Sequence, residues 1–430
     1  MGFWGIAVLP RRSFALLGLG LMALVVGVRA DAEVTPGQKQ ATASMKAPSV
    51  SYQPLAFSEV PGWDQDDHAA AFKAFQKSCE RVQAAARERS SGDKSPAPPQ
   101  ALVEVCAAAG KLAARISKEH AKAFFERHFA ANRLNHSGPQ GLLTGYYEPV
   151  LEGSRSPQGR FQTPVYRRPP DLVNLVDETQ RAQAGQSLTH ARKTEKGIEP
   201  YATRAEIEQG SLRGKGLELL YLADPVDLFF MQIQGSGRVK LTDGSSIRLH
   251  YDGKNGHPYS SIGRYLIEKG LFAADKMSLA SLSNWLKADP ERGKKVMWQN
   301  ASYVFFRELL GAEAGAAKGA MNSPLTPGRS LAVDPAYHVL GCPIFVSATG
   351  MRHVDKSGSF NRLMVAQDVG SAIKGPERGD IYFGTGDAAG RLAGITKHVG
   401  KFIVLLPKSA PAEADLGSGF GQTTVVKSQR

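Results

Sequence analysis

The 430-residue sequence predicts an α+β protein that is mainly β, with its helices gathered toward the N-terminus. Segments between residues 63 and 134 place apolar side chains at helical spacing. From Pro139 onward, short apolar runs alternate with turns of Gly, Pro, Asp and Ser, which is the pattern of strands. The chain also holds 45 glycines and 25 prolines, and this frequency favours strands and turns over a helical bundle.

The first 30 residues are predicted to be a signal peptide. Arg11 and Arg12 precede an apolar run over residues 14–28, which is short for a membrane span and suits the core of a signal sequence. Residues 28–30 fit a cleavage site, so a mature chain is expected to begin near Asp31. An uncleaved anchor is the alternative, and the paired arginines also allow twin-arginine export. No cysteine follows the cleavage site, so the sequence does not support a lipid anchor.

The mature chain is expected to begin with a linker over residues 31–60, which are rich in Thr, Pro, Ser and Ala. Helices are predicted over 63–88, over 101–116 and from a capping serine, Ser117, onward. Further short helices are expected at 260–269 and 279–287. Strands are predicted at 142–150, 165–167, 219–223, 228–234, 239–242, 246–251, 303–306, 331–333, 343–346, 363–367, 381–383 and 401–406. The polar tail 407–430 is predicted to be disordered.

The chain has three cysteines. Cys79 and Cys106 flank a polar stretch between two predicted helices, and either a disulfide between these helices or two buried thiols fits the pattern. Cys342 is expected to be a small core residue. No cluster of Cys or His has metal-ligand spacing, so we expect neither a metal nor another cofactor.

The formal net charge is +13, and loss of the leader's three arginines would leave about +10. This balance favours an anionic partner, for which cell-wall polymer qualifies as well as nucleic acid. The sequence contains no helix-turn-helix pattern, basic helix or aromatic ribonucleoprotein motif, so we expect no nucleic-acid partner. Most of the Lys and Arg are interpreted as solvated surface charge.

Asp368 is the leading candidate for a catalytic residue. It lies between the apolar runs 363–366 and 369–373 and is followed closely by Gly370. A carboxyl group in this setting is expected to be half-buried at a strand end, where burial raises its pKa. A carboxyl that keeps its proton near neutral pH can donate that proton to a leaving oxygen. A structural aspartate that caps a turn or helix is the alternative.

Two further aspartates occupy similar places. Asp380 follows a turn 12 residues after Asp368, so the chain can return and bring the two carboxyls near each other. Asp334 ends the apolar run 331–333 and precedes a turn. Paired acids are the usual requirement for cleaving glycosidic bonds. Each of these residues also fits an ordinary turn position.

Two glycine-containing segments are candidates for ligand contact. Residues 232–238 (QIQGSGR) lack the lysine of a phosphate-binding loop, and their polar, glycine-lined pattern suits sugar hydroxyls. Residues 144–149 (TGYYEP) hold adjacent tyrosines, one on each face of a strand, so one ring is free to stack on a sugar. Ordinary hairpin residues are the alternative. Since the sequence shows no nucleophile elbow or Cys–His pair, we do not expect nucleophilic acyl transfer.

Together these segments resemble the membrane-bound lytic murein transglycosylase A family over residues 120–406. The resemblance is carried by five motifs: TGYYEP (144–149), FFMQIQGSGR (229–238), SYVFF (302–306), LAVDP (331–335) and QDVGSAIKG (367–375). The last part also resembles the three-aspartate (3D) module, whose name fits Asp334, Asp368 and Asp380.

The resemblance implies a double-psi β-barrel built from the early and late parts of the chain, with a second β-rich, barrel-like domain inserted between them. The N-terminal helices and the first part of the barrel would occupy residues 61–150. The insertion would occupy 151–300, and the second part of the barrel, with the 3D module, 301–406. The substrate groove would lie at the junction of the two domains.

The resemblance also implies the reaction, which is lytic exotransglycosylation by a carbon–oxygen lyase. The family cleaves the β-1,4 bond between N-acetylmuramic acid and N-acetylglucosamine in peptidoglycan and leaves a 1,6-anhydromuramoyl end. Asp368 matches the family's catalytic acid, and Asp380 matches a second aspartate that tunes it. The substrate-binding candidates are Thr144, Tyr146, Gln234, Ser236 and Asp334.

Two other functions stay open from the sequence: a hydrolase that uses water in the same groove, and a cell-wall binding protein without activity. The expected partner is the glycan strand of peptidoglycan, and the expected state is a monomer. The expected location is the periplasm, with association with the outer membrane or a wall-synthesis complex as a further possibility.

Overall fold

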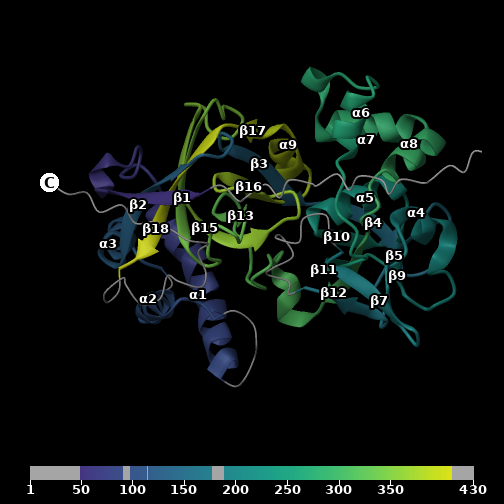
Figure 1. Ribbon diagram of the computed structural model, residues 1–430, viewed down its shortest axis with the longest axis horizontal. Helices are drawn as coiled ribbons and strands as arrows, with labels where there is room; N and C mark the ends of the chain where they lie inside the picture. The colour runs from purple at the N-terminus through teal and green to yellow at the C-terminus, as the bar shows by residue number, and fades with distance from the viewer. Residues whose placement is uncertain (1–48, 91–96, 114, 177–187, 409–430) are drawn as a thin grey trace, which may run out of the picture. The chain divides into compact units, whose positions relative to one another are not determined.

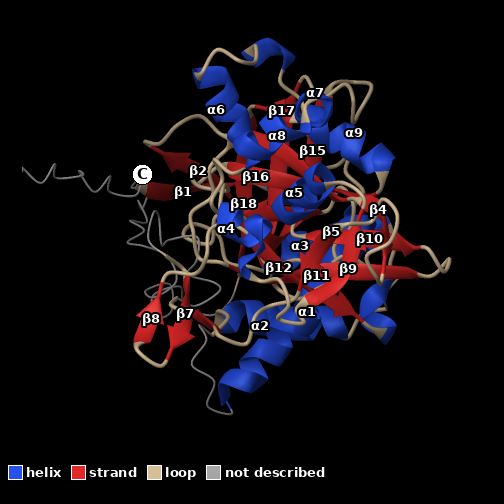
Figure 2. Cartoon of the chain, turned by 90° about the vertical axis from the view of Figure 1, so that its right-hand side faces the viewer, coloured by secondary structure: helices blue, strands red, loops and turns tan. Residues whose placement is uncertain are grey.

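The computed structural model describes residues 49–90, 97–113, 115–176 and 188–408. The predicted signal peptide, most of the predicted linker and nearly all of the predicted tail lie outside these ranges. The described chain is a mixed α+β protein, mostly sheet with several helices (Figures 1 and 2). The coarse fold class predicted from the sequence is therefore confirmed.

The end of the predicted linker is a strand instead. β1 (Val50–Leu55) pairs antiparallel with β2 (Phe129–His136). Val50 and Tyr52 are buried on one face of β1, in a cluster with Leu134. The linker prediction rested on composition, and it overlooked this alternation of apolar and polar residues.

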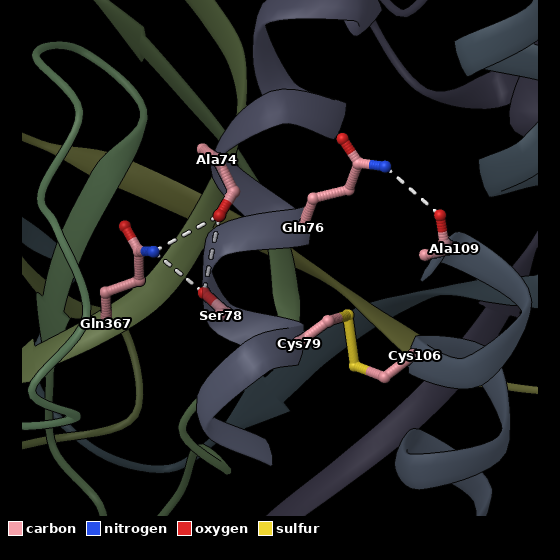
Figure 3. The surroundings of a disulfide bond; sticks show 7 residues. All are labelled: Ala74, Gln76, Ser78, Cys79, Cys106, Ala109 and Gln367. Carbon is pink, nitrogen blue, oxygen red and sulfur yellow. Dashed lines mark hydrogen bonds between the residues drawn. A yellow bond between two sulfur atoms is a disulfide. The ribbon is translucent and has the colours of Figure 1, made fainter. Parts of the chain in front are cut away.

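Three N-terminal helices follow: α1 (His68–Ser90), α2 (Gln100–Gly110) and α3 (Lys118–His128). The predicted cap, Ser117, accepts a hydrogen bond from the backbone N–H of His120 and starts α3. Cys79 and Cys106 form a disulfide that joins α1 to α2, which decides between the two alternatives left open by the sequence (Figure 3). Cys342 is a buried free thiol, as predicted.

The larger sheet has nine strands in the order β1-β2-β18-β14-β15-β13-β16-β3-β17. It combines early and late parts of the chain, and two of its pairings, β13 with β15 and β16 with β3, are parallel. Its strands beyond β1 and β2 are β3 (Leu142–Glu148), β13 (Ser330–Val333), β14 (Pro343–Thr349), β15 (Ser359–Val369), β16 (Arg378–Thr385), β17 (Lys397–His398) and β18 (Gly400–Pro407).

The second sheet has six strands in the order β12-β11-β10-β4-β9-β5, all from the middle of the chain. These strands are β4 (Val150–Ser154), β5 (Thr163–Tyr166), β9 (Glu218–Leu222), β10 (Ser236–Leu241), β11 (Ser246–Lys254) and β12 (Val304–Leu309). β12 pairs with β11, so the strand expected near 303–306 belongs to this sheet. The predicted boundary at residue 300 is thus too early to contain the whole sheet.

Smaller elements complete the described chain. β6 (Leu172–Asn174), β7 (His190–Thr194) and β8 (Gly197–Glu199) form a three-stranded sheet. The remaining α-helices of the described residues are α4 (Arg204–Glu206), α5 (Pro225–Gln234), α6 (Ile262–Glu268), α7 (Leu279–Ala288), α8 (Pro290–Met297) and α9 (Asp387–Ile395). Among the residues that the structure describes, no helix has both the length and the apolar character to cross a membrane.

The strand predicted over 228–234 is wrong, because this segment is helix α5. Asp224 caps the helix, Pro225 occupies its first turn, and Gly235 ends it with a positive φ of 79°. Six of its ten residues are buried, and its apolar residues 228–231 run continuously, so the sequence shows no clear 3.6-residue period. An apolar run of this kind does not distinguish a buried helix from a buried strand.

β15 passes between two apolar cores, and this placement matters for the site. Leu363 and Val365 pack in a cluster with the N-terminal helices. Met364 and Ala366 point the other way, into a cluster made by the strands of the nine-stranded sheet. The register with β13 then shifts, because Leu331 pairs with Ala366 whereas Ala332 pairs with Asp368. Gln367 is therefore the extra residue of a β-bulge that lies directly before the acid.

Candidate active site

Asp368 lies near the end of β15, and three hydrogen bonds hold its carboxyl group. Oδ1 accepts the backbone N–H groups of Ala320 and Val369, each at 2.9 Å, and Oδ2 accepts the hydroxyl of Tyr146 at 2.9 Å. The side chain is half-buried, as the sequence predicted. Burial raises the pKa of Asp368 to about 6, although the three hydrogen bonds act in the opposite direction.

The strand register places the second acid on the same face of the sheet. Ala332 of β13 pairs with Asp368 on one side and with Asp380 on the other. Residues directly opposite in neighbouring strands point to the same face. The two acids therefore flank the small side chain of Ala332, on backbones two strand spacings, or roughly 10 Å, apart.

Asp380 is held from its other side by Thr144. The two residues are register partners in β16 and β3, and the Thr144 hydroxyl donates to Oδ1 of Asp380. Burial raises the pKa of Asp380, whereas the charge of Arg378 and the Thr144 hydrogen bond oppose this rise. Burial thus raises the pKa of both carboxyls of the row above the usual aspartate value.

A groove of about 270 Å³ opens beside this row and is lined from both sheets. Five of the predicted site residues line it: Tyr146, Gln234, Ser236, Asp368 and Asp380. Thr144 is outside the lining and reaches the groove only through Asp380. The groove therefore brings together segments that are distant in the sequence.

Asp334 does not belong to the groove, contrary to its prediction as a substrate-binding residue. Its side chain is 4% exposed, and its carboxylate accepts the backbone N–H groups of Ala336 at 3.1 Å and Gly375 at 2.9 Å. Asp334 is also absent from the residues that line the groove. The alternative interpretation, an aspartate that organises turns, is the one that its contacts support.

The two tyrosines of the segment 144–149 have different surroundings. Tyr146 is 9% exposed, its ring lies 5.3 Å from that of Tyr382, and its hydroxyl is committed to Asp368. Tyr147 is half-buried, and its backbone N–H donates to Oε1 of Gln234 at 3.0 Å. The hydrogen bond from Tyr146 to the acid was not foreseen from the sequence, which suggested ring stacking.

The same segment carries a buried ion pair that joins the two sheets. Glu148 is fully buried, and its carboxylate accepts Nε of Arg248 at 2.7 Å and Nη2 at 3.1 Å. The Thr385 hydroxyl donates to the same carboxylate at 2.8 Å. Glu148 and Thr385 belong to the nine-stranded sheet and Arg248 to the six-stranded sheet, so this bidentate pair connects the two walls of the groove.

Sequence reasoning missed the basic side chains of the groove: Arg204, Lys254, Lys318 and Arg378. Arg204 is 1% exposed, stacks over the rings of Phe229 and Tyr303, and donates to the backbone carbonyls of Asn300 and Ser302. Isolated basic residues carry no motif, so only the fold could gather them here. Among the described residues, no three His, Cys, Asp or Glu side chains form a group that could hold a metal ion.

Comparison with known proteins agrees with this geometry. Residues 142–307 match the MltA specific insert domain, and residues 329–406 match the 3D domain. A curated relative from Escherichia coli K12, membrane-bound lytic murein transglycosylase A, is 36% identical over 284 residues, which is 64% of this chain and 68% of the relative.

Solved structures give the same result. The membrane-bound lytic murein transglycosylase from Agrobacterium tumefaciens is 36% identical and has a TM-score of 0.73, over 83% of this chain and 98% of that protein. E. coli MltA with bound chitohexaose is 29% identical and has a TM-score of 0.58, over 85% and 95% of the two chains. The fold, the acid-lined groove and these matches define the class of lytic murein transglycosylases. Within that class, the chain belongs to the membrane-bound lytic murein transglycosylase A family.

Proposed function

We propose that this protein cleaves the β-1,4 bond between N-acetylmuramic acid and N-acetylglucosamine in peptidoglycan, with Asp368 as its single acid–base group. The observation that carries the proposal is a half-buried carboxyl in the groove whose pKa is raised to about 6. With that value, about half of the molecules hold the proton at pH 6 and about one in ten at pH 7. The chitohexaose bound to E. coli MltA supports a glycan as the ligand.

The proposed reaction needs one group that first gives and then takes a proton. Protonated Asp368 donates to the bridging oxygen, the bond from this oxygen to the muramoyl C1 breaks, and N-acetylglucosamine leaves with a free 4-hydroxyl. The muramoyl 6-hydroxyl then attacks C1 and gives its proton to the Asp368 carboxylate. The product is a 1,6-anhydro ring, no water is consumed, and the acid returns to its starting state.

The neighbours of Asp368 would have separate roles in this scheme. Tyr146 and the Ala320 N–H orient the carboxyl group and stabilise the carboxylate that forms after proton donation. Asp380, held by Thr144, raises the pKa of Asp368 by its negative charge. Gln234 and Ser236, on the opposite wall, are placed to bind sugar hydroxyls and amides.

We also propose that the nine-stranded sheet is the double-psi β-barrel of this family and that the six-stranded sheet is its inserted domain. Two features support this assignment: the larger sheet draws on both ends of the described chain, and it mixes parallel with antiparallel pairs. On this view the protein acts in the periplasm as a monomer that meets glycan strands there. Its relatives are named membrane-bound lytic murein transglycosylases, which supports a place in the cell envelope.

The test combines one variant with product analysis. Asp368→Ala should lower cleavage of purified wall sacculi by about three orders of magnitude or more, because the leaving oxygen loses its proton donor, while binding to the sacculi persists. Mass spectrometry of products released by the unaltered protein should show anhydro-muramoyl ends. Reducing ends would instead establish the hydrolase, and binding without any release would establish a cell-wall binding protein. Undiminished cleavage by Asp368→Ala would remove Asp368 from the mechanism.

A further inference from the structure

Gln367, the residue before the acid, is a fully buried amide with an unusually complete set of partners. It is 0% exposed and lies on the face of β15 that meets the N-terminal helices. Its side chain hydrogen-bonds to four groups: Nε2 donates to the carbonyl of Ala74 at 3.2 Å and to the hydroxyls of Ser78 at 2.7 Å and Ser323 at 3.1 Å, and Oε1 accepts the hydroxyl of Ser330.

Two of these partners belong to α1. Figure 3 shows the Gln367 amide nitrogen reaching Ala74 and Ser78, one helical position before Cys79 of the disulfide. The helix is therefore tied to α2 through Cys106 and to β15 through Gln367. A buried amide whose polar atoms are all satisfied specifies one arrangement of the elements around it, because any shift leaves unpaired polar groups.

The third partner belongs to the loop that contacts the acid. Ser323 binds the Gln367 amide, the Met321 N–H donates to the Gln367 carbonyl at 3.3 Å, and the Ala320 N–H reaches Asp368. The loop lies so close to the strand that a Cβ on Gly319 would be 2.4 Å from the Gln367 carbonyl oxygen. Gln367 thus binds this loop through both its side chain and its backbone. The same loop supplies the Ala320 N–H that holds the Asp368 carboxyl.

We propose that Gln367 is a positioning residue, which fixes helix α1 and the loop 319–323 against β15 and thereby keeps the Ala320 N–H on the Asp368 carboxyl group. The inference rests on the proposed function, since it assigns a supporting role to the acid of that reaction. Gln367 does not touch the groove and acts only through Asp368 and the loop.

The proposal has a consequence that a merely structural role would not produce. The Ala320 N–H stabilises the charged form of Asp368 and lowers its pKa, so a loosened loop lets the pKa rise further. The titratable groups that face Asp368 are Tyr146, Asp380 and Tyr382, and Lys318 and Arg378 line the same groove. None of these residues is a partner of the Gln367 amide, so a change at Gln367 leaves them in place.

The matched pair for the test is Gln367→Met and Gln76→Met. Gln76 is an amide of α1 that also bridges elements, through hydrogen bonds from Nε2 to the carbonyls of Ala109 at 3.1 Å (Figure 3) and Leu112 at 3.3 Å. Neither of these partners belongs to the loop 319–323. Gln367→Met should lower kcat/KM on soluble glycan strands about tenfold at pH 6 through misplacement of the acid. It should also move the alkaline limb of the kcat/KM profile upward by about half to one pH unit. Gln76→Met should change neither quantity.

The shift of the alkaline limb distinguishes a positioning role from a loss of folded protein. A smaller folded fraction lowers kcat/KM at every pH but does not move the limb. An unmoved limb in Gln367→Met, or an equal shift in Gln76→Met, would overturn the proposal. If Gln367→Met fails to fold, Ser323→Ala removes only the contact to the loop and should move the limb in the same direction by a smaller amount.

A second readout needs no cleavage. The Asp368 carboxyl can be titrated by NMR in protein labelled with ¹³C-aspartate and assigned by its loss in Asp368→Asn. The Asp368 signal should titrate at higher pH in Gln367→Met than in the unaltered protein. If the unaltered protein releases no anhydro products, the proposed function fails, yet this titration still accepts or rejects the role of Gln367.

Discussion

The two walls of the groove differ in what they supply and in how they hold it. The nine-stranded wall supplies both acids, Asp368 and Asp380, from positions that pair with the same residue, Ala332, of the strand between them. The six-stranded wall supplies an amide, a hydroxyl and buried cations from a helix end and the segments around it, including Gln234 and Arg204. The two carboxyls, for which we propose action at a single bond, are thus placed on paired strands. The groups for which we propose contacts with the glycan chain are spread over a wider surface. The predictions below test this division.

The largest effect is expected at the second acid. Asp380→Asn removes the negative charge that raises the pKa of Asp368, so the alkaline limb of kcat/KM should move to lower pH. The rate at pH 7 should fall about tenfold, because fewer molecules carry the proton of Asp368 and because a charged group that lines the groove beside it is lost. Steady-state kinetics between about pH 4 and about pH 8, which brackets the Asp368 pKa of about 6, would measure the position of the limb and the rate at pH 7.

The control is Asp334→Asn, which changes the strand-end aspartate that organises turns outside the groove. It should lower the melting temperature and leave the pH profile in place. A limb that moves upward in Asp380→Asn would contradict the proposed influence of this residue on the acid.

An intermediate effect is expected on the six-stranded wall. Gln234→Ala removes a side chain that lines the groove and accepts the Tyr147 N–H. KM for glycan strands should rise about 3- to 10-fold with kcat within about twofold, since one or two hydrogen bonds are lost and the acid is untouched. The matched control is Arg238→Ala, an exposed residue of the same motif outside the lining, which should leave KM unchanged. A fall in kcat alone would mean that this wall takes part in the chemical step.

The smallest effect is expected at Tyr146. Tyr146→Phe keeps the buried ring and removes the hydroxyl that donates to Asp368. Because this hydrogen bond lowers the pKa of Asp368, its loss should move the alkaline limb upward by about half a pH unit and lower kcat/KM a few fold. The direction is opposite to that of Asp380→Asn, so a shared direction would show that the two residues do not act on the acid as described.

The sequence was most informative about the site where it placed a charged residue among apolar ones. Asp368 stood out because a carboxyl between two apolar runs costs free energy unless it has a role, and the structure gives it a half-buried place in the groove. The same reasoning also selected Asp334, whose carboxyl satisfies backbone N–H groups in turns. Short-range pattern alone could not separate these two cases, because the difference lies in what the fold brings to each carboxyl.

Other parts of the site leave no trace in the sequence. The donor at Ala320 is a backbone N–H, and because every residue except proline has one, the residue type does not indicate it. One of the two adjacent tyrosines was expected to stack on a sugar, and the hydrogen bond from Tyr146 to Asp368 could not be foreseen because the two residues lie 222 positions apart. α5 was predicted as a strand because its apolar residues run continuously and show no helical period. The contacts that define this site are long-range, and local propensity carries little information about them.

The order in which the chain can fold follows from the composition of the larger sheet. β2 lies between β1 and β18, and the buried pair of Asp66 with Arg329 joins residues 263 positions apart. The strands of the six-stranded sheet, by contrast, all lie within the intervening segment. The acid-bearing wall therefore cannot close until nearly all of its chain has been synthesised, whereas the other wall can assemble earlier. Sheets that depend on such distant pairings form slowly, and their unpaired edges stay open to aggregation or to chaperones in the meantime.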